Sequence, residues 1–322
     1  MSVEAAASVP SPATKQKKPQ KGLNRIWHTF WNEKYLWLMA LPGILFFLIY
    51  KYLPMLGIII AFKDYNLMLG IWDSKWAGLK HFYRIFENPD IGRIFVNTLI
   101  ISFYQIVFAF TIPIVLAIMI YEVSKNAYRR VLQTVFYMPH FLSWVVVAGI
   151  FYLIFRSDGA MNSVLADLGL GQINILSNPE NFRIMLVLQV IWKEAGWGTI
   201  IYLAALSSID PALFEAAKMD GASRLRQIWH ITLPGIRSTI VVLFILRLGS
   251  VLDVGFEQVF LMLNPSVREV GEVIETYVYQ VGVVNSNFSF STAVGLMKGL
   301  IGLVLIFGAN KLAKRMGERG VF

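Results

Sequence analysis

The chain has 322 residues, of which 56 % are hydrophobic and 15 % charged, and it contains no cysteine. A soluble chain of this length carries about a quarter charged residues, so the composition excludes an ordinary soluble protein and indicates a polytopic membrane protein. The missing cysteines exclude a disulfide framework and cysteine-based redox or metal sites, and four scattered histidines give no ligand cluster, so we expect no metal.

Residues 1–34 are small, polar and basic, and we expect a disordered cytoplasmic tail that touches the anionic inner leaflet. Its basic run consists of Lys15, Lys17, Lys18, Lys21 and Arg25. Trp27, Phe30 and Trp31 predict an interfacial helix just before the first span. A cleavable signal peptide is not expected, because no compact apolar stretch follows within the first thirty residues.

Six apolar stretches are long enough to cross a bilayer, so the predicted fold class is all-α with about six transmembrane helices. The predicted spans are residues 36–62, 94–121, 132–155, 183–204, 236–255 and 292–310. Three polar loops lie between them on one side, at residues 63–93, 156–182 and 256–290. The predicted domains are therefore the tail at 1–34, a membrane domain at 35–315, and a C-terminal tail at 316–322.

Six spans place both termini on one side of the membrane, and the basic residues decide which side. Of the 29 Lys and Arg residues, 17 lie in the two tails, in the loop at 122–131 and around residues 210–235, whereas 7 lie in the three opposite loops. The positive-inside rule therefore puts both termini and residues 210–235 in the cytoplasm. Basic cytoplasmic loops also explain the net charge of +9 better than nucleic-acid binding does.

Residues 210–235, called the EAA stretch below, form a polar segment between spans four and five. Asp210 can cap a helix that begins at Pro211, and Asp220-Gly221 supplies the turn that ends it. Ser223 can cap a second helix, which Leu233-Pro234 is expected to stop. Two short helices exposed between membrane spans are suited to docking on another protein, and the alternative is an ordinary cytoplasmic loop.

The EAA stretch resembles the EAA signature of permease subunits of bacterial ABC importers. The resemblance rests on Glu215-Ala216-Ala217, on Gly221 four residues after Ala217, and on Leu233-Pro234 twelve to thirteen residues beyond Gly221. In span layout it extends over residues 35–315. Its detail is similar to the carbohydrate-uptake branch, and within it to alginate-type importers of oligosaccharides and polysaccharides. It implies a permease subunit in the bacterial inner membrane, with a cytoplasmic coupling helix.

The resemblance also implies roles for individual residues of the EAA stretch. Glu215 would form a polar anchor at the interface with an ATPase, and Gly221 would permit the tight turn. Ala216 and Ala217 would allow close approach of the ATPase surface. The remaining members of the docking set are Asp220, Leu233 and Pro234. Without a docked partner, Glu215 would be a solvated helix residue and Gly221 a simple helix terminator.

The partners that the resemblance implies are a second permease subunit in a heterodimer, two cytoplasmic ATPase subunits, an extracytoplasmic solute-binding protein and a saccharide substrate. Neither a Gly-x-x-x-x-Gly-Lys-[Ser/Thr] loop nor a Gly-x-Ser-x-Gly elbow occurs in the chain. We therefore expect a non-catalytic subunit without a cofactor of its own, with ATP and Mg²⁺ bound by the partner ATPases.

Ionisable residues inside membrane spans are costly and are functional candidates by default. Span four contains Lys193 and Glu194, beside Trp192 and Trp197. The other ionisable residues within spans are Arg247 and Asp253 in span five and Lys298 in span six. They are predicted to line a translocation path or to pair across helices, and the alternative is that they only hold the bundle together. The three cations favour an acidic substrate such as a uronic-acid oligosaccharide.

A saccharide path also needs aromatic faces for pyranose rings and polar edges for hydroxyl groups. The further candidates are Tyr104, Gln105, Gln189, Tyr202 and Asn285. Two other classes of protein stay open. An ion-coupled secondary transporter would require inverted repeats, which are not visible, and a membrane-embedded enzyme would require clustered His, Asp or Ser residues.

Overall fold

The computed structural model describes residues 33–315 and residue 317, and it divides into two units, one through Gly57 and one from Ile58 onward. The predicted basic run and interfacial helix lie outside the described residues, as does most of the C-terminal tail. Six helical stretches of the described chain are long and apolar enough to cross a membrane. They are Lys34–Phe62, Pro89–Tyr121, Trp144–Asp167, Pro179–Ser207, Arg224–Gly249 and Phe288–Arg315.

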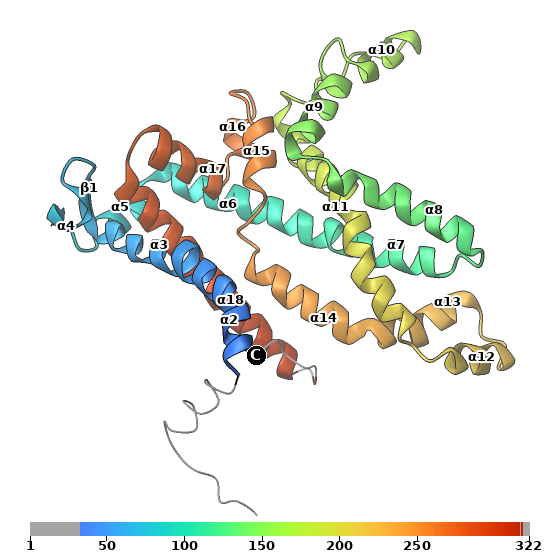
Figure 1. Cartoon of the computed structure of the whole chain (residues 1–322). Coiled ribbons are helices and arrows are strands. Elements are labelled where there is room, and N and C mark those ends of the chain that lie inside the picture. The colour runs from blue at the N-terminus through green and yellow to red at the C-terminus, as the bar shows by residue number, and fades with distance from the viewer. Residues whose placement is uncertain (1–32, 316, 318–322) are drawn as a thin grey trace, which may run out of the picture. The chain divides into compact units, whose positions relative to one another are not determined.

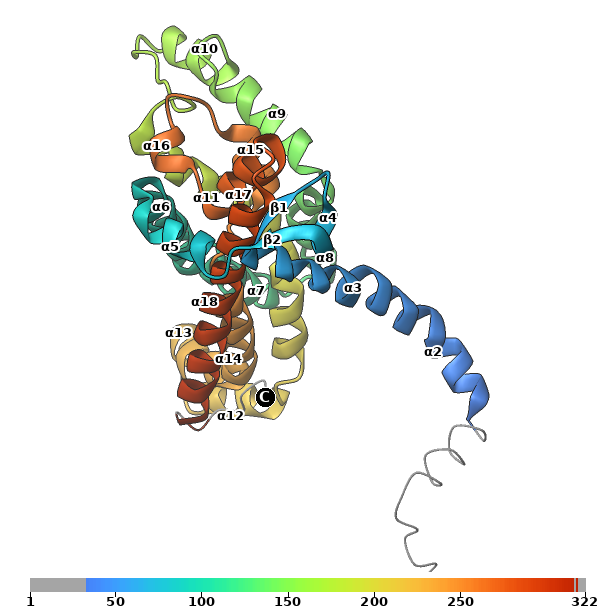
Figure 2. The ribbon, with the colours of Figure 1, turned by 90° about the vertical axis from the view of Figure 1, so that its left-hand side faces the viewer.

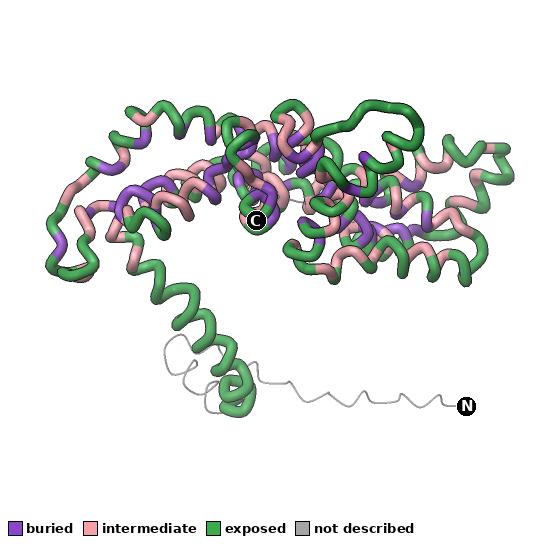
Figure 3. Tube along the Cα trace, turned by 90° about the horizontal axis from the view of Figure 1, so that it is seen from above, coloured by how far each residue is buried: buried purple, intermediate pink, exposed green. Residues whose placement is uncertain are grey.

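The first unit consists of α2 (Lys34–Phe47), the π-helical η1 (Leu48–Tyr52) and α3 (Leu53–Met55), and the 3₁₀ segment η2 (Leu56–Phe62) leads into the second unit. Residues 33–56 are exposed (Figure 3). Pro42 lies inside α2 and Pro54 in the first turn of α3, yet the helical path continues through both. The π-helical segment ends two residues before Pro54, and its wider turn accommodates a residue that has no N–H to donate.

The second unit is a helical bundle in which α11 (Pro179–Ser207) packs against helices from both halves of the sequence (Figure 1). Its neighbours are α6 (Pro89–Tyr104), η3 (Gln105–Ala109), α7 (Thr111–Tyr121), α8 (Asn126–Tyr137), η4 (Met138–Phe141), α14 (Leu233–Gly249) and α16 (Arg268–Gly271). The last helix, α18 (Phe288–Arg315), packs against α14. The EAA helices α12 (Pro211–Met219) and α13 (Arg224–Gln227) lie at one end of this unit, opposite α10 (Ala160–Asp167) (Figure 2).

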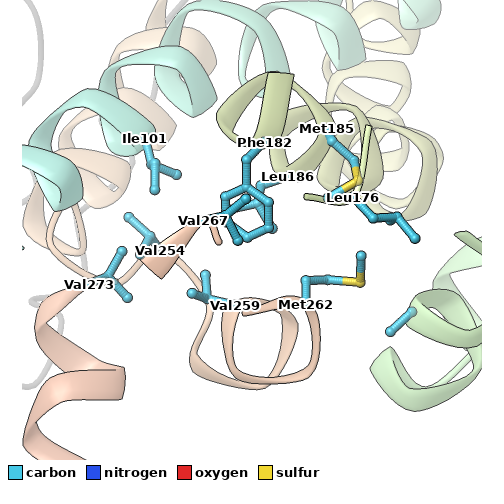
Figure 4. Close-up of a cluster of buried hydrophobic side chains, with 11 residues drawn as sticks. Ile101, Leu176, Phe182, Met185, Leu186, Val254, Val259, Met262, Val267 and Val273 are labelled. Atoms are coloured by element: carbon cyan, nitrogen blue, oxygen red, sulfur yellow. The ribbon is translucent and has the colours of Figure 1, made fainter. Parts of the chain in front are cut away.

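Three clusters of buried hydrophobic side chains hold the second unit together. Figure 4 shows the first, in which Phe182 and Leu186 of α11 meet Val259 and Met262 of α15 (Phe256–Met262). A second cluster joins Ile94 of α6 to the start of α18, and a third joins α7, α11 and α14. Because each cluster combines helices far apart in sequence, burial of apolar surface fixes how the spans are arranged.

The predicted polar loops contain ordered structure. Residues 63–93 include a short antiparallel pair, β1 (Lys63–Asn66) and β2 (Ser74–Trp76), together with α4 (Gly70–Asp73) and α5 (Lys80–Glu87). Ser289 at the start of α18 holds this pair, because its hydroxyl donates to the carbonyl of Lys63 at 2.6 Å. Residues 256–290 include α15, α16, α17 (Ile274–Tyr279) and the π-helical η6 (Gln280–Val284).

The predicted third span, residues 132–155, is wrong at its start. The chain forms α8, then the 3₁₀ turn η4, and only then α9 (Trp144–Phe155), which begins the membrane-crossing stretch. Pro139 interrupts the helical hydrogen bonds, and the Ser143 side chain accepts from the Val146 N–H to begin a new helix. Hydrophobicity continues across this break, which is why the sequence suggested one span.

The predicted stop at Leu233-Pro234 is also wrong. The helix continues from α13 through the π-helical η5 (Ile228–Thr232) into α14, so the fifth candidate span runs over Arg224–Gly249. The π turn immediately before Pro234 shifts the hydrogen-bond register, so the absent N–H of Pro234 is tolerated. The predicted fifth span, residues 236–255, also extends too far, because α14 ends at Gly249.

Candidate functional site

The backbone between α14 and α15 is non-helical over residues 250–255, in the middle of the helical bundle. Gly255 adopts φ +100°, a left-handed conformation that favours glycine, and α15 begins directly after it. The carbonyls of this segment are satisfied by α6 and η3: Ser102 donates to the carbonyl of Val251, and Gln105 Nε2 donates to that of Val254 at 3.1 Å. A broken helix with polar partners is a form that binding sites in membrane transporters take.

A cavity of about 420 Å³, called the Arg247 cavity below, lies next to this break, between η3, α7, α11 and α14. It brings together five of the predicted path residues: Gln105, Glu194, Trp197, Tyr202 and Arg247. Its volume falls in the range of about 300–1,000 Å³ typical of small-molecule sites. One cation, one carboxylate, one amide and two aromatic rings are the groups that a charged saccharide requires.

Arg247 is half-buried, and its Nη2 donates to Oε1 of Gln105 at 2.5 Å. Among the described residues, no carboxylate lies within ion-pair distance of it. A guanidinium with one neutral partner keeps further N–H groups for an anionic ligand.

Glu194 belongs to a polar cluster at the break between α8 and α9. Nζ of Lys193 lies 3.1 Å from Oε1 of Glu194 and donates to the carbonyl of His140 at 2.8 Å. Nδ1 of His140 lies 2.7 Å from Oε2 of Glu194, and the imidazole stacks on Trp197 with centroids 4.4 Å apart. Sequence reasoning missed the role of His140, and only its place beside Pro139 could have suggested it. The cluster holds the carboxylate of Glu194 at the wall of the Arg247 cavity.

A larger cavity of about 1010 Å³, called the Lys298 cavity, lies between α14, α17, η6 and α18. Lys298 pairs there with Asp253, and its Nζ also donates to Oε1 of Glu275 at 3.0 Å. Glu275 lies in a predicted loop and was not among the candidate residues. Since two carboxylates face one ammonium group, this cavity does not offer a free cation to an anionic ligand.

The other five candidates, of which Lys193 is one, line neither cavity in the described part of the chain. Gln189 is fully buried and accepts from Gln258 Nε2 at 2.8 Å, which joins α11 to α15. Trp192 makes an edge contact with Phe151, with centroids 6.1 Å apart. Tyr104 lies against Phe103 and Phe108, and Asn285 is exposed where η6 ends.

The EAA stretch forms the second candidate site. The side chain of Asp210 accepts from the Ala212 N–H at 2.9 Å, and Ser223 accepts from the Arg226 N–H, so both predicted caps are present. Gly221 adopts φ +71° at the turn between the two helices. Glu215, Ala216, Asp220 and Pro234 are exposed, whereas Ala217 and Leu233 are half-buried.

The surface of the EAA stretch carries large apolar side chains that are exposed. Met219 is 89 % exposed, Leu225 70 % and Trp229 67 %, and Leu213 is exposed as well. Next to them, Glu215, Lys218 and Arg224 line a hollow of about 700 Å³ against the end of α7 and the start of α8. Apolar side chains around a polar hollow are the features of a protein-docking surface.

The chain is similar to known transport proteins over most of its length. Residues 109–318 match the family described as "Binding-protein-dependent transport system inner membrane component". The chain is 50 % identical to Protein LplB of Bacillus subtilis (strain 168), over 90 % of this chain and 92 % of that protein. It is also 50 % identical to the polygalacturonan/rhamnogalacturonan transport system permease protein YteP of the same organism, over 90 % and 91 %.

The fold is similar to that of a chain in a solved transporter. The crystal structure is that of a bacterial alginate ABC transporter in complex with alginate pentasaccharide-bound periplasmic protein. The two chains superpose with a TM-score of 0.85 and 40 % sequence identity, covering 92 % of this chain and 100 % of that chain.

Proposed function

Because the chain belongs to the family of binding-protein-dependent transport system inner membrane components, we propose that it forms half of the pathway of an ABC importer for acidic oligosaccharides. A second permease subunit completes the pathway, two cytoplasmic ATPase subunits supply the energy, and an extracytoplasmic binding protein delivers the saccharide. The named relatives support the substrate class, since YteP is a polygalacturonan/rhamnogalacturonan transport system permease protein and the solved structure is that of an alginate ABC transporter.

The observation that carries the proposal for an acidic substrate is the charge balance of the Arg247 cavity. Glu194 is neutralised by Lys193 at 3.1 Å, whereas in the described structure the side chain of Arg247 hydrogen-bonds only to the neutral Gln105, and Asp253 acts on it from beyond ion-pair distance. The cavity therefore has an excess positive charge in a low-dielectric environment, which favours a carboxylate over a neutral hydroxyl group. Trp197 supplies an aromatic face for a pyranose ring, and the amide of Gln105 supplies hydrogen bonds to hydroxyl groups.

The EAA stretch supports the proposal for a docked ATPase. In the proposed orientation both termini and this stretch face the cytoplasm, as the distribution of Lys and Arg favours. Met219, Leu225 and Trp229 would be buried against the ATPase, and Glu215 would supply a polar anchor among them. Closure of two ATPases around ATP would then move α12 and α13 as a rigid body and change access to the Arg247 cavity. An ion-coupled transporter is not favoured, because it would leave this exposed surface without a role.

The experiment is a reconstitution of the complete transporter in proteoliposomes with its binding protein. We expect trigalacturonate to stimulate ATP hydrolysis and to accumulate inside the vesicles, and we expect the neutral maltotriose to do neither. Stimulation by maltotriose and not by trigalacturonate would contradict the acidic substrate. Uptake of saccharide along an ion gradient without ATP would contradict the ABC mechanism.

A further inference from the structure

A third cavity, called the Arg156 cavity, is lined by α9, by α15 and by the loops that precede α11 and follow α15. In Figure 1, α9 and α15 lie at the end of the bundle opposite α12 and α13. Its volume is about 650 Å³, again within the range of ligand sites. One wall is the face of α9 that contains Ala148, Gly149 and Tyr152, and Arg156 follows directly after the last residue of this helix. In the proposed orientation this end faces the exterior, where a saccharide arrives.

The lining of the Arg156 cavity is rich in unused polar groups. Among the described residues, the side chains of Ser157, Ser177 and Ser266 donate no hydrogen bond, and neither does the hydroxyl of Tyr152. The side chain of Asn174 accepts from the Ser177 N–H at 3.2 Å, which leaves its amide N–H groups available. These are the donors and acceptors that a polyhydroxylated ligand uses.

Two asparagines hold the walls of the cavity in place. Asn162 is buried and joins α10 to the following loop. Its Nδ2 donates to the carbonyls of Arg156 and Ile173, both at 3.1 Å. Its Oδ1 accepts from the Ile173 N–H at 2.8 Å. Asn264 Nδ2 donates to the carbonyl of Leu176 at 2.9 Å and so connects the two loops that face α9. A cavity whose walls are already cross-linked binds a ligand with a smaller loss of conformational entropy.

Arg156 gives this cavity its charge. Its Nε is buried and donates no hydrogen bond within the described chain, although Oδ1 of Asp158 lies 3.1 Å away. Asp158 is exposed and does not line the cavity, so its carboxylate can move into solvent when another anion approaches. A guanidinium whose ion-pair partner is an exposed carboxylate can exchange that partner for the carboxylate of a ligand.

We propose that the Arg156 cavity is an outer saccharide subsite, in which Arg156 binds the carboxylate of one uronate residue and the exposed ring of Tyr152 lies against its pyranose face. The inference rests on the proposed function, because it assumes an acidic oligosaccharide. The neighbouring Asn174 hydrogen-bonds the ring hydroxyl groups. An oligosaccharide leaving the binding protein would occupy this subsite before it reaches the Arg247 cavity.

The test uses the absence of cysteine from this chain. Ser177→Cys places a single thiol in the cavity wall without removing a hydrogen bond, since only the backbone of Ser177 is bonded. In the complete reconstituted transporter with its binding protein, we measure the rate of maleimide labelling of this thiol with and without trigalacturonate. We expect trigalacturonate to slow labelling by at least about tenfold, and maltotriose to leave it unchanged.

Two further variants separate the subsite from shielding by the docked binding protein. On the Ser177→Cys background, Arg156→Gln should abolish the protection by trigalacturonate. Arg93→Gln is the matched control and should retain it, because Arg93 is also 41 % exposed and paired with an exposed aspartate, yet lies on α6 outside the cavity. A thiol at Ala160→Cys, exposed at the start of α10, should not be protected.

Three results would overturn the subsite. They are protection that persists in Arg156→Gln, equal protection by maltotriose, and a thiol at position 177 that stays unreactive in the assembled transporter because a partner chain fills the cavity. Failure of the proposed function is distinguishable, because trigalacturonate would then stimulate no ATP hydrolysis in the unmodified transporter.

Discussion

The polar groups of the Arg247 cavity have partners within this chain. Arg247 donates a hydrogen bond to Gln105. Glu194 pairs with Lys193 and with His140. In the EAA stretch, Met219, Leu225 and Trp229 are exposed, and nothing in residues 33–315 covers them. The fold itself organises the cavity, whereas we propose that the EAA stretch docks another protein. Substitutions in the first should therefore act on the isolated chain and its substrate, and substitutions in the second should act on assembly.

The largest effect is expected from Glu215→Arg. Reversing a charge at the centre of a protein interface costs several kcal/mol, so retention of the ATPase should fall by about a hundredfold or more. The chain itself should still insert into the membrane, since Glu215 is exposed. Co-purification of the ATPase with this subunit and immunoblotting of the membrane fraction measure the two quantities. Asp167→Arg, an exposed carboxylate at the opposite end, is the control and should retain the ATPase. Normal ATP-coupled uptake by Glu215→Arg would contradict the anchoring role.

Arg247→Met is expected to have the next largest effect, on the substrate and not on assembly. Loss of hydrogen bonds to a charged group costs about 1.5–3 kcal/mol, so uptake of trigalacturonate should fall by about ten- to a hundredfold. Arg247→Lys should retain part of the uptake, because it keeps the charge but loses the planar donor geometry.

The single substitution Arg247→Met leaves Oε1 of Gln105 without its donor. The double variant Arg247→Met with Gln105→Leu removes this oxygen as well. It should not recover uptake, because the cavity still lacks its cation, and it should not recover thermal stability, because the buried carbonyl of Val254 loses its donor, Gln105 Nε2. If Arg247→Met instead loses the ATPase from the complex, the division between the two regions is wrong.

Gly196→Ala tests the packing of α11, one of the helices that line the Arg247 cavity, against α8. A Cβ at this position would lie 1.9 Å from the carbonyl oxygen of Phe136, where α11 crosses α8. The backbone must move, so the free energy of unfolding should decrease by about 3 kcal/mol. Thermal unfolding of the purified subunit in detergent measures it. Gly92→Ala, where a Cβ meets nothing within 4 Å, should be neutral or slightly stabilising.

The smallest effect on stability is expected from Gly221→Ala. The residue adopts φ +71°, which costs an L-residue about 1–2 kcal/mol, but only the local turn between α12 and α13 depends on it. Thermal unfolding of the purified subunit should therefore change little, while affinity for the ATPase should decrease measurably. An equal loss in both measurements would mean that the turn supports the membrane bundle as well.

The EAA stretch was predictable from sequence in most of its local detail. Helix caps and turns depend on residues only a few positions apart, so Asp210, Ser223 and Gly221 indicated the two short helices directly. The same rules predicted that the helix stops at Leu233-Pro234, but in the structure it continues. A π turn in η5 compensates for Pro234, and hydrophobic periodicity does not reveal such a turn.

The number of spans, the bias of positive charge to one side of them and the EAA pattern were determined by the sequence alone, because they depend on composition and on local spacing. Only the tertiary structure decided that Arg247 meets Gln105, that His140 meets Glu194, and that Lys298 is neutralised by Asp253 and Glu275. These pairs lie on different helices, and their meeting depends on how the bundle buries its apolar surface. Ionisable residues in a span could therefore be recognised as costly from sequence, but the partner that offsets each cost is chosen by helix packing.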